Sequence, residues 1–171
     1  MGLSSGVYKF VLLLHILAAI AGFGPTLLAP AFAAQARSRR GKEGLAIFDA
    51  TYTVLSTYAT WIIYSVPVFG ILLILVSDDV WKFSQMWISL SLLLYIVAIG
   101  VVHAIHQPNL RKMGQLLAEL AEGPPPGAAA GGSPPQVAEL ESRGQRAALV
   151  GGLLNLNLVL ILVLMIWKPG L

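Results

Sequence analysis

The sequence predicts an all-α protein, a bundle of four transmembrane helices. Its 171 residues are 57% hydrophobic and only 11% charged, whereas soluble domains carry about 25% charged residues. The charged residues are also clustered, and four uncharged stretches of 21 to 28 residues separate the clusters. A helix crosses the apolar part of a bilayer with about 20 residues. The four stretches lie between Lys9 and Arg37, Asp49 and Asp78, Lys82 and Arg111, and Arg146 and Lys168.

The chain is expected to form one domain over residues 1–171, with its spans placed by hydrophobicity and by helix-breaking residues. Pro108 marks the expected end of span three, because proline lacks the N–H that a helix interior needs. The expected spans run from about Val7 to Ala34, Leu45 to Ser77, Val80 to Ile105 and Ala147 to Trp167.

The distribution of Lys and Arg predicts the orientation of the spans. Eight of the eleven basic residues follow span one, within residues 37–42, or span three, within residues 111–146. Short loops rich in Lys and Arg stay in the cytoplasm, so both termini are expected outside. Aromatic side chains prefer the headgroup level, which suits Trp81, Trp87 and Trp167 at the outer ends. Trp61 does not fit this belt, and we expect it to be buried within the bundle.

The cytoplasmic loop between spans three and four is expected to be largely helical. Leu110, Met113, Leu117 and Leu120 recur at helical spacing, and Val137 to Arg146 also has a helical pattern. Residues 123–135 between them are rich in Pro and Gly and predict a flexible linker. Two interpretations of this loop remain open: two helical extensions of the spans, or one interfacial helix. A helix that docks a partner is a further alternative.

Several classes of function are excluded by the residues themselves. The chain has no Cys, which rules out thiolate metal sites, iron–sulfur clusters and cysteine nucleophiles. No catalytic triad or phosphate-binding loop is found. The net charge of +3 comes from loops where topology needs basic residues, so nucleic acid is not an expected partner. We therefore interpret the chain as a non-enzymatic protein.

Small and polar residues predict which faces of the spans pack. In span one, His15, Ala18 and Gly22 belong to one stripe of mostly small residues that should face the bundle. In span four, Asn155 and Asn157 lie roughly 200° apart on the helical wheel, so both cannot point into one seam. One of them is expected either to hydrogen-bond a neighbouring backbone carbonyl or to contact another subunit.

His15 is the strongest candidate for a functional site, because an ionisable residue inside a span is costly and usually functional. Its depth below the outer surface suits a pocket with Tyr64, Ser91 and Asn157. Three interpretations compete: a neutral histidine bonded across the bundle, a haem ligand paired with Met86 or with a second copy's histidine, and a copper site. The copper site would use His15, Met86 and Met165. His103 and His106 lie too far along the helix axis to join His15.

Short motifs near both ends of the chain resemble a bacterial integral-membrane family, number 2269 among the domains of unknown function. The matching segments are 8–17 around His15, 87–90 at Trp87, and 153–169 with Asn155 and Trp167. The resemblance implies four helices in the bacterial plasma (inner) membrane. The family is in turn similar to copper-resistance membrane proteins and to haem-dependent protoporphyrinogen oxidases, which also carry a histidine in their first helix. Only His15 carries over from them.

These observations lead to one main hypothesis and two alternatives. The main hypothesis is a multi-pass accessory or interaction subunit of a membrane complex, in contact with lipid and with other subunits or further copies. Asn155 and Asn157 are its candidate interface residues. The first alternative is a redox module that binds haem b through His15. The second is a copper-handling protein that uses His15 and Met86.

Overall fold

The structure is a computed structural model that describes residues 2–39, 41–122 and 135–170. Within these residues, four long helical segments run up and down, and each is long and apolar enough to cross a membrane. This confirms the predicted all-α, four-span fold. The segments are α1 (Gly6–Ser38), α2–η1–α3 (Lys42–Thr53, Val54–Ala59, Thr60–Leu75), α4–η2–α5 (Met86–Val101, Val102–His106, Gln107–Glu122) and α6 (Pro135–Trp167).

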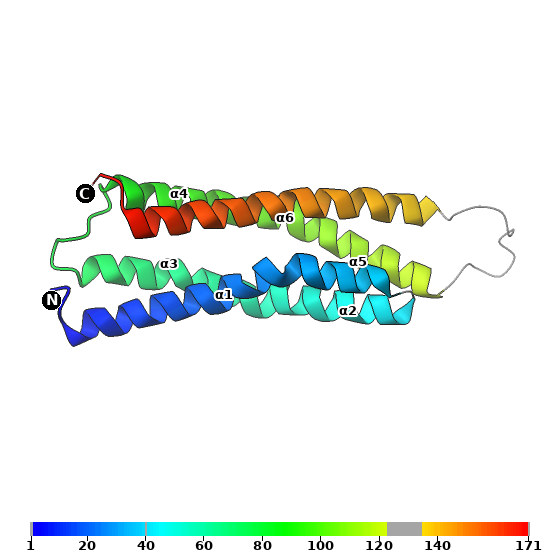
Figure 1. The fold of residues 1–171 in the computed structure, drawn as a ribbon, viewed down its shortest axis with the longest axis horizontal. Helices are drawn as coiled ribbons and strands as arrows, with labels where there is room; N and C mark the ends of the chain where they lie inside the picture. Colours follow the sequence, from blue (N-terminus) through cyan, green and yellow to red (C-terminus); the bar gives the residue numbers. More distant parts are fainter. Residues whose placement is uncertain (1, 40, 123–134, 171) are drawn as a thin grey trace, which may run out of the picture.

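The start of α1, the end of α6 and the α3–α4 connection share one end of the bundle (Figure 1). We call this the terminal end and the opposite one the loop end. At the loop end α5 and the first part of α6 continue two of the spans and pack on each other. Of the two interpretations of the loop between spans three and four, the structure shows the pair of helical extensions. The predicted linker, 123–135, lies outside the described residues except for Pro135, which begins α6.

We expected the third span to end at Pro108, and this prediction was wrong. The helix continues through the proline to Glu122. A π-helical turn, η2, ends at His106, two residues before the proline, and the Gln107 N–H donates to the Val102 carbonyl. A proline ring crowds the carbonyl of the preceding turn. The wider π turn gives the ring room, so the chain stays helical.

The third span also begins later than predicted, at Met86 rather than near Val80. Asp78 and Asp79 have φ of 60° and 61°, the left-handed region that Asp tolerates better than most residues. The Ser77 hydroxyl accepts the Trp81 N–H at 3.0 Å, which closes the turn after α3. Two left-handed residues cannot continue a right-handed helix, so residues 76–85 form the connection.

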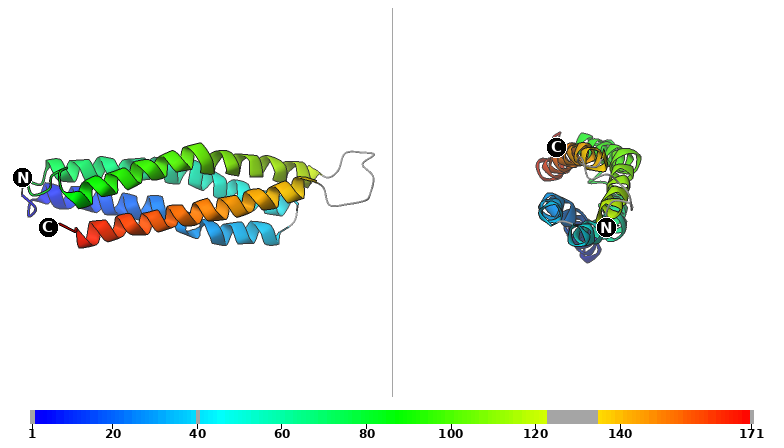
Figure 2. Two further views of the ribbon diagram at one scale, coloured as in Figure 1. Left: turned by 90° about the horizontal axis from the view of Figure 1, so that it is seen from above. Right: turned by 90° about the vertical axis from the view of Figure 1, so that its right-hand side faces the viewer.

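The four segments form two helix pairs, and the separation between the two pairs changes along the bundle. The first pair is α1 with α2–α3, and the second is α4–α5 with α6. At the loop end the pairs meet, where the Arg111 Nε donates to the Tyr52 hydroxyl at 3.0 Å. At the terminal end they separate (Figure 1). Seen along the bundle, the ribbons of α1 and α6 leave a gap on one side (Figure 2), and the two helices make only a few contacts with each other.

Gly22 sets the close approach within the first pair. It is buried, as the small-residue stripe predicted, and a Cβ added to it would lie 3.1 Å from the Ile63 backbone nitrogen. Small residues allow such backbone approach in membrane helices. The prediction for Trp61 was wrong, because its side chain is 71% exposed on α3. The helices are lipid-facing on this side, so an apolar ring gains nothing from burial in protein.

Candidate functional site

A cavity of about 450 Å³ lies between the two helix pairs towards the terminal end. Residues of α1, α3, α4 and α6 line it, and most of them are apolar. The polar side chains of its lining, apart from two indoles, are Tyr8, His15, Ser91, Tyr95 and Lys168. No Asp or Glu is among the lining residues. The cavity therefore offers an apolar interior with a few polar groups, the usual character of a small-molecule site.

His15 is held by a backbone hydrogen bond across the α1–α3 contact. Its Nδ1 lies 2.9 Å from the Val66 carbonyl oxygen. A carbonyl only accepts, so Nδ1 carries the proton and donates, and Nε2 of the neutral ring keeps its lone pair. Gly70 makes room for the ring, since a Cβ there would lie 3.3 Å from the His15 Cε1. The ring thus presents Nε2 as a hydrogen-bond acceptor, and no other described residue donates to it.

Tyr95 bridges the two helix pairs beside the cavity. Pro67 has no N–H, so the carbonyl of Ile63, four residues earlier, lacks its helical donor. The Tyr95 hydroxyl donates to that carbonyl at 3.3 Å. The proline in α3 thus creates the acceptor that α4 uses, and the bond links the pairs where their backbones stand apart.

Aromatic side chains and one cation gather where the cavity meets the terminal end. The Trp81 Nε1 donates to the Tyr8 hydroxyl at 2.9 Å, and Trp81 packs edge-on against Trp87. The Lys168 Nζ lies 4.3 Å from the Trp81 ring centroid and 5.6 Å from that of Trp87. The Trp87 Nε1 is buried and has no hydrogen-bond partner among the described residues. We call these four residues, Tyr8, Trp81, Trp87 and Lys168, the mouth cluster.

The predicted pocket residues separate into two groups. Ser91 lines the cavity with His15; it is 2% exposed and donates to the Trp87 carbonyl at 2.6 Å. Tyr64 is not a lining residue and hydrogen-bonds to His103 instead. Met86 is also outside the lining and is 56% exposed, whereas Met165 lines the cavity. His15, Met86 and Met165 thus do not share one site.

The two asparagines of α6 have different surroundings. The Asn157 Nδ2 donates to the Leu94 carbonyl at 3.4 Å, which is the bond to a neighbouring backbone considered above. Asn157 is therefore on the α4–α6 contact and outside the cavity lining. Asn155 is half-buried, and its amide makes no hydrogen bond with the described residues.

His103 and His106 lie in the π turn η2, away from His15. His103 also contacts Gln107 through its Nδ1, at 3.2 Å. The His106 ring packs beside Gly151, and its buried Nδ1 has no partner among the described residues. No group of three metal-ligating His, Asp or Glu side chains forms in the described chain. These histidines therefore serve the contacts of η2 in the structure and do not extend the cavity.

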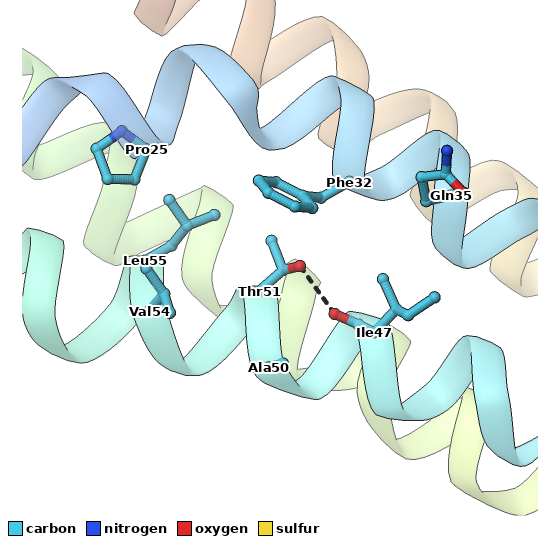
Figure 3. Close-up of a pocket in the computed structure, with 8 residues that line it drawn as sticks. All are labelled: Pro25, Phe32, Gln35, Ile47, Ala50, Thr51, Val54 and Leu55. Carbon is cyan, nitrogen blue, oxygen red and sulfur yellow. Dashed lines mark hydrogen bonds between the residues drawn. The ribbon is translucent and has the colours of Figure 1, made fainter.

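A second hollow, of about 430 Å³, lies between α1 and α2 near the loop end (Figure 3). Its lining is apolar except for Gln35 and Thr51, and the Thr51 hydroxyl donates to the Ile47 carbonyl of its own helix at 2.8 Å. This hollow contains no titratable side chain. The cavity around His15 is accordingly the better candidate site.

Sequence reasoning found His15 and Ser91 but missed the mouth cluster and Gly70. Trp81 and Trp87 were interpreted only as interfacial anchors, and Lys168 only as the end of the last uncharged stretch. Their meeting depends on how α6 ends beside the α3–α4 connection. Gly70 carried a usable signal, since a glycine in an apolar span often admits a neighbouring side chain closely.

The comparisons with known proteins give one match. The model of the family described as predicted integral membrane protein (DUF2269) matches residues 9–169. No curated protein and no solved structure matches the chain significantly.

Proposed function

The chain belongs to the DUF2269 family of predicted integral membrane proteins, and we propose that it binds a lipophilic small molecule in the cavity between its two helix pairs. The observation that carries this proposal is the cavity itself, with apolar walls and the His15 Nε2, an acceptor that has no partner among the described residues. With the predicted orientation, the site lies in the outer half of a bacterial plasma membrane. The protein acts there as a binding component and not as a catalyst.

The surroundings of the cavity support a ligand that arrives from the bilayer. Its volume is within the range of about 300 to 1,000 Å³ that is common for ligand sites. Ile20 of α1 and Ile166 of α6 line it, yet they are 65% and 69% exposed. They belong to α1 and α6, two helices that make only a few contacts with each other. A lipophilic molecule can therefore enter sideways from the acyl chains without crossing a polar surface.

Filling the cavity tests this function. Ala19 lines the cavity, whereas Ala21 of the same helix is exposed and does not. We expect native mass spectrometry of the wild-type protein to show a lipophilic adduct that survives detergent removal. Ala19→Phe should lose the adduct, because the added ring occupies its volume, and Ala21→Phe should keep it. Equal adducts in all three proteins, or none in any, would contradict the proposal.

Haem b is one ligand of this kind, and the residues around His15 fit it. Histidines that ligate metals usually donate their other ring N–H to a carbonyl or carboxylate, as the His15 Nδ1 does to Val66. Met165 lines the same cavity. Bound haem would supply one-electron redox chemistry. A Soret band that disappears in His15→Ala would identify haem as the ligand, and its absence from protein made with ample haem would exclude haem only.

A role as an accessory subunit is the second candidate function, and Asn155 favours it. An amide without a partner in a membrane span costs free energy that a polar group of a neighbouring subunit removes. We expect Asn155→Leu to reduce the size of the complex measured by light scattering in mild detergent. Asn157→Leu is the control, because Asn157 bonds within its own bundle. A monomer of unchanged size in all three proteins would count against this role.

A further inference from the structure

We infer that the ligand of the cavity is an anionic amphiphile, with its headgroup at Lys168 and its apolar part between the helix pairs. This inference rests on the proposed function and adds the chemical class of the ligand. Lys168 is part of the cavity lining and of the mouth cluster.

Lys168 is a half-buried cation whose neighbours are aromatic faces. Its Nζ contacts the rings of Trp81 and Trp87, and it forms no ion pair with the described residues. Aromatic faces attract a cation but do not neutralise it. Among the described residues, the charge therefore lacks a counter-ion, and the cavity lining contains no carboxylate.

The indole of Trp87 adds a second polar group beside Lys168. The buried Trp87 Nε1–H has no acceptor among the described residues, and an oxyanion near Lys168 would lie beside the indole that carries it. Lys168 is the first residue after α6 and has φ of 44°, a left-handed conformation that commonly ends a helix. The chain thus leaves the helix at Lys168, whose ammonium group lies over the two indoles at the cavity lining.

The rest of the cavity fits the apolar part of such a molecule. Ile16 and Ile20 from α1, with Leu162 and Ile166 from α6, form exposed apolar rims. A chain can lie between these rims while its headgroup stays at the membrane surface, where charged groups belong. A neutral apolar ligand would fill the same walls but leave the charge of Lys168 unpaired.

Tryptophan quenching by brominated probes tests the inference. Trp61 and Trp167 are exposed and outside the lining, so Trp61→Phe with Trp167→Phe leaves Trp81 and Trp87 as reporters. The protein is placed in phosphatidylcholine nanodiscs and titrated with a dibrominated alkyl sulfonate or with the alcohol of the same chain. We expect the sulfonate to quench saturably at concentrations about tenfold lower, as a charge-assisted hydrogen bond predicts. Brominated phosphatidylglycerol, in a third arm, shows whether a bilayer lipid serves as well as a free amphiphile.

Variants separate the headgroup from the cavity. Lys168→Met should abolish the preference for the sulfonate, and Lys168→Arg should retain it. Lys82→Met is the control, since Lys82 is exposed near the same end and outside the lining. The inference is overturned if the sulfonate has no advantage over the alcohol in the unmodified reporter protein, or if Lys168→Met preserves that advantage. In that case, loss of saturable quenching by both probes in Ala19→Phe would still support the cavity as a ligand site, but not for an anionic ligand. If Ala19→Phe keeps saturable quenching, the proposed function and this inference are both wrong.

Discussion

Replacing Gly22 by leucine is expected to destabilise the bundle by about 1–3 kcal/mol, the usual cost of overpacking a close contact. A Cβ at this position would lie 2.9 Å from the Ile63 Cγ1 and 3.1 Å from the Ile63 backbone nitrogen. The side chain of Ile63 can rotate away, but the backbone of α3 cannot, so α1 must move outwards. Because α1 supplies His15, the movement also widens the α1–α3 contact next to the cavity.

Gly24→Leu is the matched control for this prediction. Gly24 lies two residues along the same helix, and a Cβ there meets nothing within 4 Å. Each variant replaces one glycine of α1 by the same side chain. Thermal unfolding in detergent, followed by circular dichroism, should therefore show a clear loss for Gly22→Leu and little change for Gly24→Leu. Equal losses would mean that the close approach of α3 at Gly22 does not determine the effect, since leucine favours a helix more than glycine does.

Replacing Gly70 by valine is expected to weaken ligand binding by about tenfold or more, because the orienting hydrogen bond of His15 is lost. A Cβ at Gly70 would lie 3.3 Å from the Cε1 and 3.6 Å from the Nδ1 of the ring. The two methyl groups of valine add further bulk at that contact. The ring must turn, which breaks the bond from Nδ1 to the Val66 carbonyl and misdirects Nε2.

Gly100→Val serves as the control, since a Cβ at Gly100 of α4 also meets nothing within 4 Å. Titration with the brominated alcohol in the two-tryptophan background measures the affinity without involving the charge of Lys168. Gly70→Val should bind weakly and Gly100→Val like the unmodified protein. Normal binding by Gly70→Val would show that His15 does not contribute to ligand binding and that the apolar walls alone form the site.

The spans could be predicted from the sequence because their signal is local. Uncharged stretches of helix-spanning length, such as that from Lys9 to Arg37, need no knowledge of neighbours. Pro108 misled the prediction because a π turn can absorb a proline, and that adjustment has no clear mark in the sequence. Trp61 misled it because lipid accepts an aromatic ring as readily as a protein interior does.

The site could be predicted only in part, for a related reason. His15 stands out because a titratable side chain is rare within a span. Its partner is the Val66 carbonyl, which carries no side-chain signature, and its space comes from Gly70 on another helix. The cavity exists because the helix pairs separate at one end, and Lys168 reaches it through the turn after α6. These features depend on how the whole chain packs.

A structure determined in lipid nanodiscs will show whether the space between the two helix pairs is a ligand site. We expect non-protein density inside the cavity, in contact with His15 and reaching the aromatic and basic residues of the mouth cluster. A bundle in which α3 and α4 pack together along their length, with side chains filling the space and no such density, would contradict this expectation.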